Sequence, residues 1–214
     1  MNMNKAPDAK SQAAKRKQPM KAWMKTIVAG AAVLGLSGCI SLGSEPPPSL
    51  LTLTSTSSVA AGMTSTGTAD SAIKILEPEV PQRLNVTRVP VQVDATEIAY
   101  LKDAVWVERP ARLFQRLLAE TIRAKSNRLV IDGEDPGLIA KSQLRGTLRE
   151  FGYDAATSSV IVRFDAVRAG ADGAIETRRF ESVQSGVVAE TGPVGDALNR
   201  GANDVASQVA DWIG

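Results

Sequence analysis

Residues 142–187 read SQLRGTLREFGYDAATSSVIVRFDAVRAGADGAIETRRFESVQSGV. The stretch predicts three consecutive β-strands, at residues 143–153, 159–168 and 174–187. The breaks between them, residues 154–158 and 170–173, have the length and composition of hairpin loops. An antiparallel three-strand meander is therefore expected in this half of the chain.

Amphipathic helices are predicted on either side of the meander. Glu108-Arg109-Pro110 opens the first, because proline fits a first helical turn, where its missing N–H costs nothing. Its apolar stripe recurs at three- and four-residue spacing and consists of Leu113, Phe114, Leu117, Leu118 and Ile122. The second helix begins near residues 193–196 and repeats this spacing as far as Ile213. Both helices are expected to pack on one face of the sheet.

Shorter strands are predicted before the first helix and between that helix and the meander. Their apolar residues fall at positions 50–53, 73–76, 86–93, 97–101 and 129–131. Pro78, Pro81 and Pro90 keep these segments at sheet edges or strand starts. The fold class is therefore α/β in the α+β sense, with a mixed, largely antiparallel sheet. Residues 54–71, almost entirely Ser, Thr, Ala and Gly, predict a flexible loop.

The composition excludes several classes of function. Of 25 Lys and Arg residues seven precede Cys39, and of 23 Asp and Glu residues one does, so the rest carries 18 and 22, a net charge of −4. A net-acidic chain with few aromatic residues argues against nucleic-acid binding. With no histidine and one cysteine, the sequence cannot build a His-containing triad, a His or Cys zinc site, or an intrachain disulfide. It also lacks the P-loop and G-x-S-x-G motifs, so no enzyme activity and no cofactor is predicted.

The N-terminal segment has the layout of a secretory signal. Polar, basic residues 1–25 precede the apolar run at 26–36, which is shorter than the roughly 20 residues of a membrane-spanning helix. Leu36-Ser37-Gly38-Cys39 follows and resembles a bacterial lipobox. By that resemblance the bond between Gly38 and Cys39 is cleaved, and Cys39 receives the lipid. Residues 1–38 are thus the predicted signal peptide, whether translation starts at Met1 or Met20.

The predicted mature chain begins with a tether. Several acyl chains, such as diacylglycerol and palmitate, anchor a protein durably where one does not. Residues 39–49 combine the lipidated cysteine with three consecutive prolines and predict a semi-rigid spacer. The folded domain is expected at residues 50–214. An ordinary signal or core helix with a free Cys39 is the alternative.

Three groups of residues are candidate functional sites. The acidic cluster Asp132, Glu134 and Asp135 lacks the spacing of a calcium loop, so a solvated turn is favoured over a metal or acid–base site. Trp106 is interpreted as a core or rim aromatic, with a partner surface as the weaker alternative. The arginines of the meander favour a solvated face over an anion site; they are Arg163, Arg168, Arg178 and Arg179.

The run EIAYLKDAVWVERP at residues 97–110 leads into LFQRLL at 113–118. Together with the lipobox and Leu51-Thr52-Leu53, it resembles the ABC-type transport auxiliary lipoproteins, the PqiC-like family, over residues 50–211. The resemblance implies a domain anchored in the outer membrane, facing the periplasm. It also implies a complex with an MCE-domain protein and an inner-membrane ABC permease and ATPase, which moves lipid or other hydrophobic substrates, and in some members a homo-oligomeric ring.

Two other functions stay open on the sequence alone. An outer-membrane assembly or lipopolysaccharide-insertion accessory lipoprotein shares the anchor and the α/β domain. A glycan-cleaving enzyme that uses only carboxylates would need paired acids such as Asp132 and Glu134.

The residue after the predicted lipidated cysteine bears on sorting. Ile40, rather than aspartate, follows Cys39 and resembles the sequence of lipoproteins sorted to the outer membrane.

Overall fold

The computed structural model describes residues 49–126, 128–133 and 139–214. The elements in chain order are β1 (Ala72–Ile75), the 3-10 helix η2 (Gln82–Leu84), β2 (Arg88–Gln92), β3 (Ile98–Val105), α2 (Pro110–Lys125), β4 (Leu129–Ile131), β5 (Ser142–Asp154), β6 (Ser159–Ala169), β7 (Ile175–Ser185) and α3 (Thr191–Ile213). The predicted signal peptide (1–38) and all but the last residue of the predicted spacer (39–49) lie outside the described residues. None of the described helices is long and apolar enough to span a bilayer.

Strand β5 organises the sheet because it pairs along both edges. On one edge it forms an antiparallel ladder of eleven residue pairs with β6, which pairs in the same way with β7. The other edge is shared: β1 pairs in parallel with the start of β5, and β2 pairs in parallel with its end. Between these two, the segment that contains η2 leaves the sheet, with a single bridge from Glu79 to Thr147. The sheet is therefore mixed, with its long ladders antiparallel.

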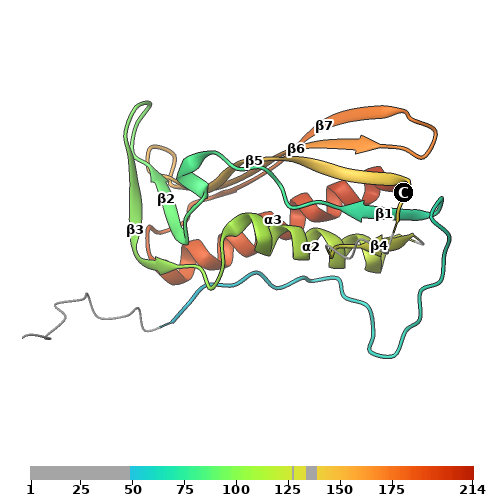
Figure 1. The fold of residues 1–214 in the computed structure, drawn as a ribbon. Coiled ribbons are helices and arrows are strands. Elements are labelled where there is room, and N and C mark those ends of the chain that lie inside the picture. Colours follow the sequence, from blue (N-terminus) through green and yellow to red (C-terminus); the bar gives the residue numbers. More distant parts are fainter. Residues whose placement is uncertain (1–48, 127, 134–138) are drawn as a thin grey trace, which may run out of the picture. The chain divides into compact units, whose positions relative to one another are not determined.

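Helices α2 and α3 cover one face of this sheet, as Figure 1 shows. Helix α2 packs against β1 and β4, and α3 packs against β3, β5, β6 and β7. Small residues allow α3 to come close to the sheet. A Cβ added at Gly201 would lie 3.0 Å from Cγ2 of Val162 on β6.

Aromatic side chains fill the space between the helices and the sheet. The ring centroids of Trp106 and Phe151 lie 5.4 Å apart, and those of Phe114 and Phe164 also lie 5.4 Å apart. All four residues are at most 1% exposed. Such tilted pairs stabilise the fold beyond the area that they bury.

The predicted fold class, the meander and the two helices on one face are confirmed. Three details of the prediction are wrong. Residues 50–53 form no strand, because Leu51 makes only one bridge, to Trp106. Strand β3 runs on to Val105 instead of ending at Leu101, with the backbone of Asp103 in the left-handed region at φ 57°. The short helix η2 was not anticipated.

Residues 51–59, called the strap below, lie in extended form along α2 and α3, on the side of the helices away from the sheet (Figure 1). Odd-numbered residues of the strap are half-buried and even-numbered residues are exposed. Its backbone N–H groups donate to side chains of both helices, for example from Thr56 to Asn203 and from Val59 to Glu120. These contacts of residues 54–59 were not part of the predicted loop at 54–71, whose flexibility stays a prediction.

Candidate functional site: an interaction groove on the open sheet face

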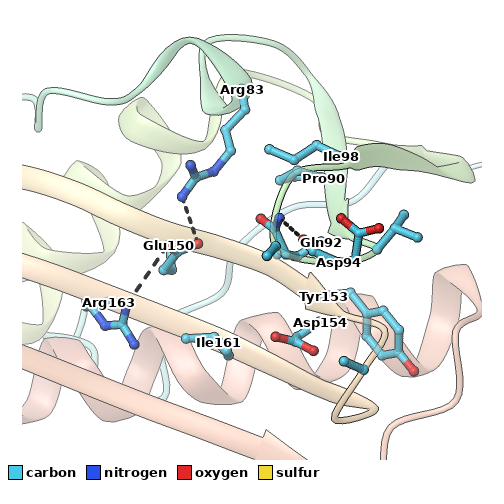
Figure 2. Close-up of a pocket in the computed structure, with 14 residues that line it drawn as sticks. Arg83, Pro90, Gln92, Asp94, Ile98, Glu150, Tyr153, Asp154, Ile161 and Arg163 are labelled. Carbon is cyan, nitrogen blue, oxygen red and sulfur yellow. Dashed lines mark hydrogen bonds and ion pairs between the residues drawn. The ribbon is translucent and has the colours of Figure 1, made fainter.

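A groove of about 450 Å³ lies on the face of the sheet opposite the helices (Figure 2). Strands β5 and β6 supply its floor through Glu150, Gly152, Ile161 and Arg163. These residues alternate along their strands with buried residues that face the helices, because successive side chains of a strand point to opposite faces. The hairpin of β2 and β3 supplies a wall, with Ile98 near its tip.

Gly152 determines how close the hairpin wall lies to the floor of the groove. Strand β2 meets the end of β5 through the parallel pair of Val91 and Tyr153. An added Cβ on Gly152 would lie 2.5 Å from the carbonyl oxygen of Pro90. Only glycine therefore lets β2 approach β5 at this point and close one side of the groove.

Paired charges cross the groove floor. Glu150 lies between Arg83 of η2, at 2.8 Å, and Arg163 of β6, at 3.9 Å, as the dashed lines in Figure 2 mark. Arg163 also forms an ion pair with Glu181 on β7. Each charged group here has an opposite partner, so the floor carries ordered charge with little net excess.

A second ionic cluster continues this pattern on the same face. Asp165 accepts hydrogen bonds from Nε of Arg179, at 2.6 Å, and from Nε of Arg149, at 2.9 Å. The hydrogen bond from Arg179 contributes most to lowering the pKa of Asp165 to about 2. Asp165 is therefore ionised at every physiological pH, and it fixes two arginines across three neighbouring strands.

Apolar side chains lie exposed beside these charges. Val93 and Ile98 of the hairpin are each 39% exposed, and Val183 of β7 is 48% exposed. Val183 is the cross-strand neighbour of Ile161 on the groove floor. Exposed apolar groups gathered next to ordered polar groups are typical of a surface that binds another molecule.

The two acids at the groove mouth hold turns. Oδ1 of Asp94 accepts from the backbone N–H groups of Thr96 and Glu97, and these bonds lower the pKa of Asp94. Oδ1 of Asp154 accepts from the backbone N–H of Thr157 in the β5–β6 turn. Among the described residues, no three His, Cys, Asp or Glu side chains gather where they could hold a metal ion.

The site residues predicted from sequence fall in several places. Gly38 and Cys39 lie outside the described residues. Trp106 is 1% exposed and packs on Phe151, so the prediction of a partner surface at this side chain is wrong and the core interpretation is correct. The physical reason is that Trp106 directly follows β3, where its ring packs on Phe151 of β5.

The other predicted groups are separated by the fold. Asp132 forms an ion pair with Arg123 of α2 at 3.4 Å, while Glu134 and Asp135 lie outside the described residues. The four arginines of the meander lie on different faces of the sheet. Arg163 and Arg179 lie on the open face, whereas Arg168 lies over the ring of Trp212 and Arg178 over that of Phe180.

Sequence reasoning missed the groove itself. Arg83 and Ile98 reach Glu150 and Ile161 only because β2 pairs with β5, more than fifty residues later in the chain. The available signal was Gly152 inside a strand pattern, since an interior glycine often marks a close backbone approach.

Comparisons with known proteins give a consistent result. The sequence model of the family "ABC-type transport auxiliary lipoprotein component" matches residues 52–210. No curated protein matches the chain significantly.

Two solved structures share the fold, those with the TM-scores of 0.61 and 0.58. A protein from Xanthomonas campestris is 15% identical, with a TM-score of 0.61, and the match covers 77% of this chain and 94% of that one. An uncharacterised protein is 14% identical, with a TM-score of 0.58, and the match covers 67% of this chain and 93% of that one. The dodecameric PelC from Paraburkholderia phytofirmans is 12% identical, with a TM-score of 0.39, over 69% of this chain and 94% of that one.

The matched residues extend from the strap to Ala210, so they include the described sheet, helix α2 and all but the last three residues of α3. The family is defined by an accessory role in transport and is not an enzyme class. This chain belongs to the family of ABC-type transport auxiliary lipoproteins.

Proposed function

We propose that acyl chains on Cys39 anchor this lipoprotein in the outer membrane, where its domain faces the periplasm and docks an MCE-domain protein of an envelope transport system. The observation that carries the proposal is the family match, which begins at residue 52, shortly after Leu36-Ser37-Gly38-Cys39. Ile40, in place of aspartate, supports sorting to the outer membrane.

The transport complex supplies what this chain lacks. The sequence has no P-loop motif, so an inner-membrane ABC ATPase and its permease provide the energy and the path through that membrane. The cargo is lipid or another hydrophobic molecule, and this domain completes the periplasmic route at its outer end. A homo-oligomeric ring of several copies is part of the same proposal.

The groove on the open face is the proposed contact for the MCE-domain protein. Its apolar wall at Val93 and Ile98 offers area to bury, and the paired charges of Glu150 and Arg163 add orientation. Charged groups that already have partners are desolvated at lower cost than isolated ones. A protein surface with apolar residues flanked by charges of both signs fits this arrangement.

The lipid anchor is tested on the mature protein purified from membranes. Mass spectrometry of the N-terminal peptide should show cleavage before Cys39 and the added mass of acyl chains. The Cys39→Ser variant should retain its leader or appear free of lipid. An unmodified thiol at Cys39 in the wild-type chain contradicts the proposed anchor.

The partner is tested by co-purification from detergent-solubilised membranes. An MCE-domain protein should accompany the wild-type chain and be lost, by at least tenfold, from the Ile98→Asp variant. Met63→Asp is the matched control, because Met63 is also exposed but lies on the loop that follows the strap. Retention of the partner by Ile98→Asp rules out the groove. Outer-membrane protein or lipopolysaccharide defects on depletion, without an MCE partner, favour the accessory role in outer-membrane assembly.

A further inference from the structure

The strap is held by side chains that recognise its backbone. Oδ1 of Asn203 accepts from the backbone N–H of Thr56 at 2.8 Å, while Nδ2 of Asn203 donates to the carbonyl oxygen of Thr54 at 2.9 Å. One amide group on α3 therefore satisfies both a donor and an acceptor of an extended chain, as a neighbouring strand would. One turn earlier, Oδ1 of Asn199 accepts from the backbone N–H of Thr54 at 2.8 Å.

Helix α2 holds the other end of the strap. Oε1 of Glu120 accepts from the backbone N–H of Val59 at 2.9 Å, and the hydroxyls of Ser55 and Thr121 lie 3.2 Å apart. The half-buried positions between these contacts carry small side chains, which lets the strap lie close to both helices. The furrow between α2 and α3 is thus a built site for an extended backbone.

The strap packs against the folded core only through two partly buried leucines, Leu51 and Leu53. Every fully buried apolar side chain of the described residues lies at position 72 or later, and Leu51 and Leu53 are only partly buried. Beneath the strap lie the polar residues Thr121 and Asn203. Water can take over hydrogen bonds to these groups, so the strap can leave the helices without unfolding the domain.

The strap also fixes where the tether meets the domain. The backbone N–H of Leu51 donates to the carbonyl oxygen of Val105 at 2.8 Å, and the N–H of Val107 donates to the carbonyl oxygen of Leu51 at 2.9 Å. While the strap is bound, Leu51 is held on the domain by these two hydrogen bonds. When the strap is released, the first residue held on the domain is Ala69, whose carbonyl oxygen accepts from the backbone N–H of Lys141 at 2.9 Å.

We propose that the strap is a releasable lock that gives the anchored domain two tether lengths. At 3.3–3.6 Å per residue, the chain from Cys39 to Leu51 reaches at most about 40 Å, whereas the chain from Cys39 to Ala69 reaches about 100 Å. The bound strap keeps the domain near its membrane, and release lets it reach far into the periplasm. This inference rests on the lipid anchor at Cys39 described under the proposed function.

The first experiment tests the binding of the strap without any membrane. Hydrogen exchange is measured on the full chain with Cys39→Ser, so the result does not depend on lipidation. The double variant Thr54→Pro/Thr56→Pro removes two backbone N–H groups, which donate hydrogen bonds to the side chains of Asn199 and Asn203. It changes no buried apolar side chain. Amides of the strap should exchange at least tenfold faster in this variant, while the domain still unfolds in one cooperative transition. Ser58→Pro is the matched control and should exchange like the parent chain, because both donors remain.

A reversible crosslink locks the strap in place. In the Cys39→Ser background, Ser55→Cys and Thr121→Cys place two thiols where the hydroxyls now lie 3.2 Å apart. Oxidation should slow strap exchange at least tenfold, and reduction should restore the parent rate. Failure of the disulfide to form, or strap amides that exchange at the rate of an unstructured peptide in the parent chain, overturns the proposal.

The second experiment measures tether length on the lipidated chain. A donor dye on Asp172→Cys, in the β6–β7 turn, reports energy transfer to acceptor headgroups in phosphatidylethanolamine–phosphatidylglycerol vesicles. Thr54→Pro/Thr56→Pro should lower the transfer, and Ser58→Pro should not. Lost strap protection together with unchanged energy transfer overturns the proposal of two tether lengths. If the purified chain carries no lipid and does not bind vesicles, the proposed anchor at Cys39 is contradicted. The hydrogen-exchange experiment still tests whether the strap binds the helices, because it uses a chain without lipid.

Discussion

The backbone N–H of Thr56 donates to Oδ1 of Asn203, although 147 residues separate the two along the chain. Asn203 is 8% exposed and also donates to the carbonyl oxygens of Thr54 and Asn199. The buried amide of Asn203 therefore binds the backbone of the strap. This binding requires both an acceptor and a donor in the side chain at position 203. The identity of this side chain, and not only its size, therefore determines whether the strap stays bound.

Asn203→Asp keeps the shape but replaces the donor with a charged oxygen. At neutral pH this carboxylate would face the two carbonyl oxygens that now accept from Nδ2, so the strap should open more easily by about 1–3 kcal/mol. Hydrogen exchange at Thr54 and Thr56, corrected for intrinsic rates, should lose protection at pH 7 and regain it at pH 4. Protonation at the lower pH restores a donor at this position.

A matched change on the same helix controls for added charge. Gln208→Glu is also an amide-to-acid substitution, but Gln208 donates to the carbonyl oxygen of Glu181 on β7 and not to the strap. Strap protection in this variant should equal that of the wild type. Equal protection in Asn203→Asp and the wild type at pH 7 would contradict the role of the amide.

Local patterns predicted the elements of the fold because local chemistry forms them. Pro110 and the apolar stripe from Leu113 to Ile122 predicted α2, and two hairpin loops predicted the meander. The contacts of the strap could not be predicted, for the opposite reason. Its Ser- and Thr-rich composition has nothing large to bury, and its partners are polar side chains on α2 and α3 that no local pattern connects to it. The groove likewise depends on the pairing of β2 with β5, which periodicity does not reveal.

Trp106 has the one buried side-chain N or O atom without a hydrogen-bond partner among the described residues, its Nε1. An unpaired buried donor costs about 1–3 kcal/mol. Trp106→Phe removes that donor and keeps an aromatic ring against Phe151. The stability gained by removing the unpaired N–H should offset the packing lost with the smaller ring, so the free energy of unfolding should stay within about 1 kcal/mol of the wild type. Trp106→Ala removes the whole ring and should cost about 3–5 kcal/mol.

Urea unfolding of both Trp106 variants distinguishes the two effects. A Trp106→Phe variant as unstable as Trp106→Ala would show that the indole N–H contributes through a partner. Because the side chain lies in the core, neither variant should change binding to an MCE-domain protein once the folded fraction is taken into account.

Gly152→Ala should open one side of the groove. The new methyl group would lie 2.5 Å from the carbonyl oxygen of Pro90 and 2.9 Å from its Cγ, so β2 must move away from β5. Overpacking of this kind costs about 1–3 kcal/mol, and the displaced hairpin should weaken partner binding together with stability. Thermal unfolding and co-purification measure the two effects.

Gly192→Ala is the matched control for this change. A Cβ at Gly192 meets nothing within 4 Å, and the residue lies in the first turn of α3, where alanine favours the helix. This variant should be as stable as the wild type or slightly more stable. A Gly152→Ala variant that behaves in the same way would show that β2 and β5 need no glycine at their contact.

Asp165 should make a small contribution to stability that disappears in acid. Its pKa is lowered to about 2 in the folded protein, against about 3.9 in an unfolded chain. A carboxyl whose pKa falls on folding stabilises the folded state above the unfolded pKa, and the effect is lost as the pH falls from about 4 to about 2. Because Arg149 and Arg179 are more than half exposed, solvent screens these pairs, and the expected effect is below about 1 kcal/mol.

Urea unfolding of the wild type and Asp165→Asn at several pH values tests this expectation. The wild type should be more stable at pH 7, and the two chains should converge near pH 2, where Asp165 loses its charge. A double-mutant cycle with Arg179→Gln should assign most of the difference to that arginine, because its hydrogen bond is the largest cause of the lowered pKa. A difference that stays constant between pH 7 and pH 2 would mean that shape or hydrogen bonding at position 165, and not its charge, stabilises the open face of the sheet.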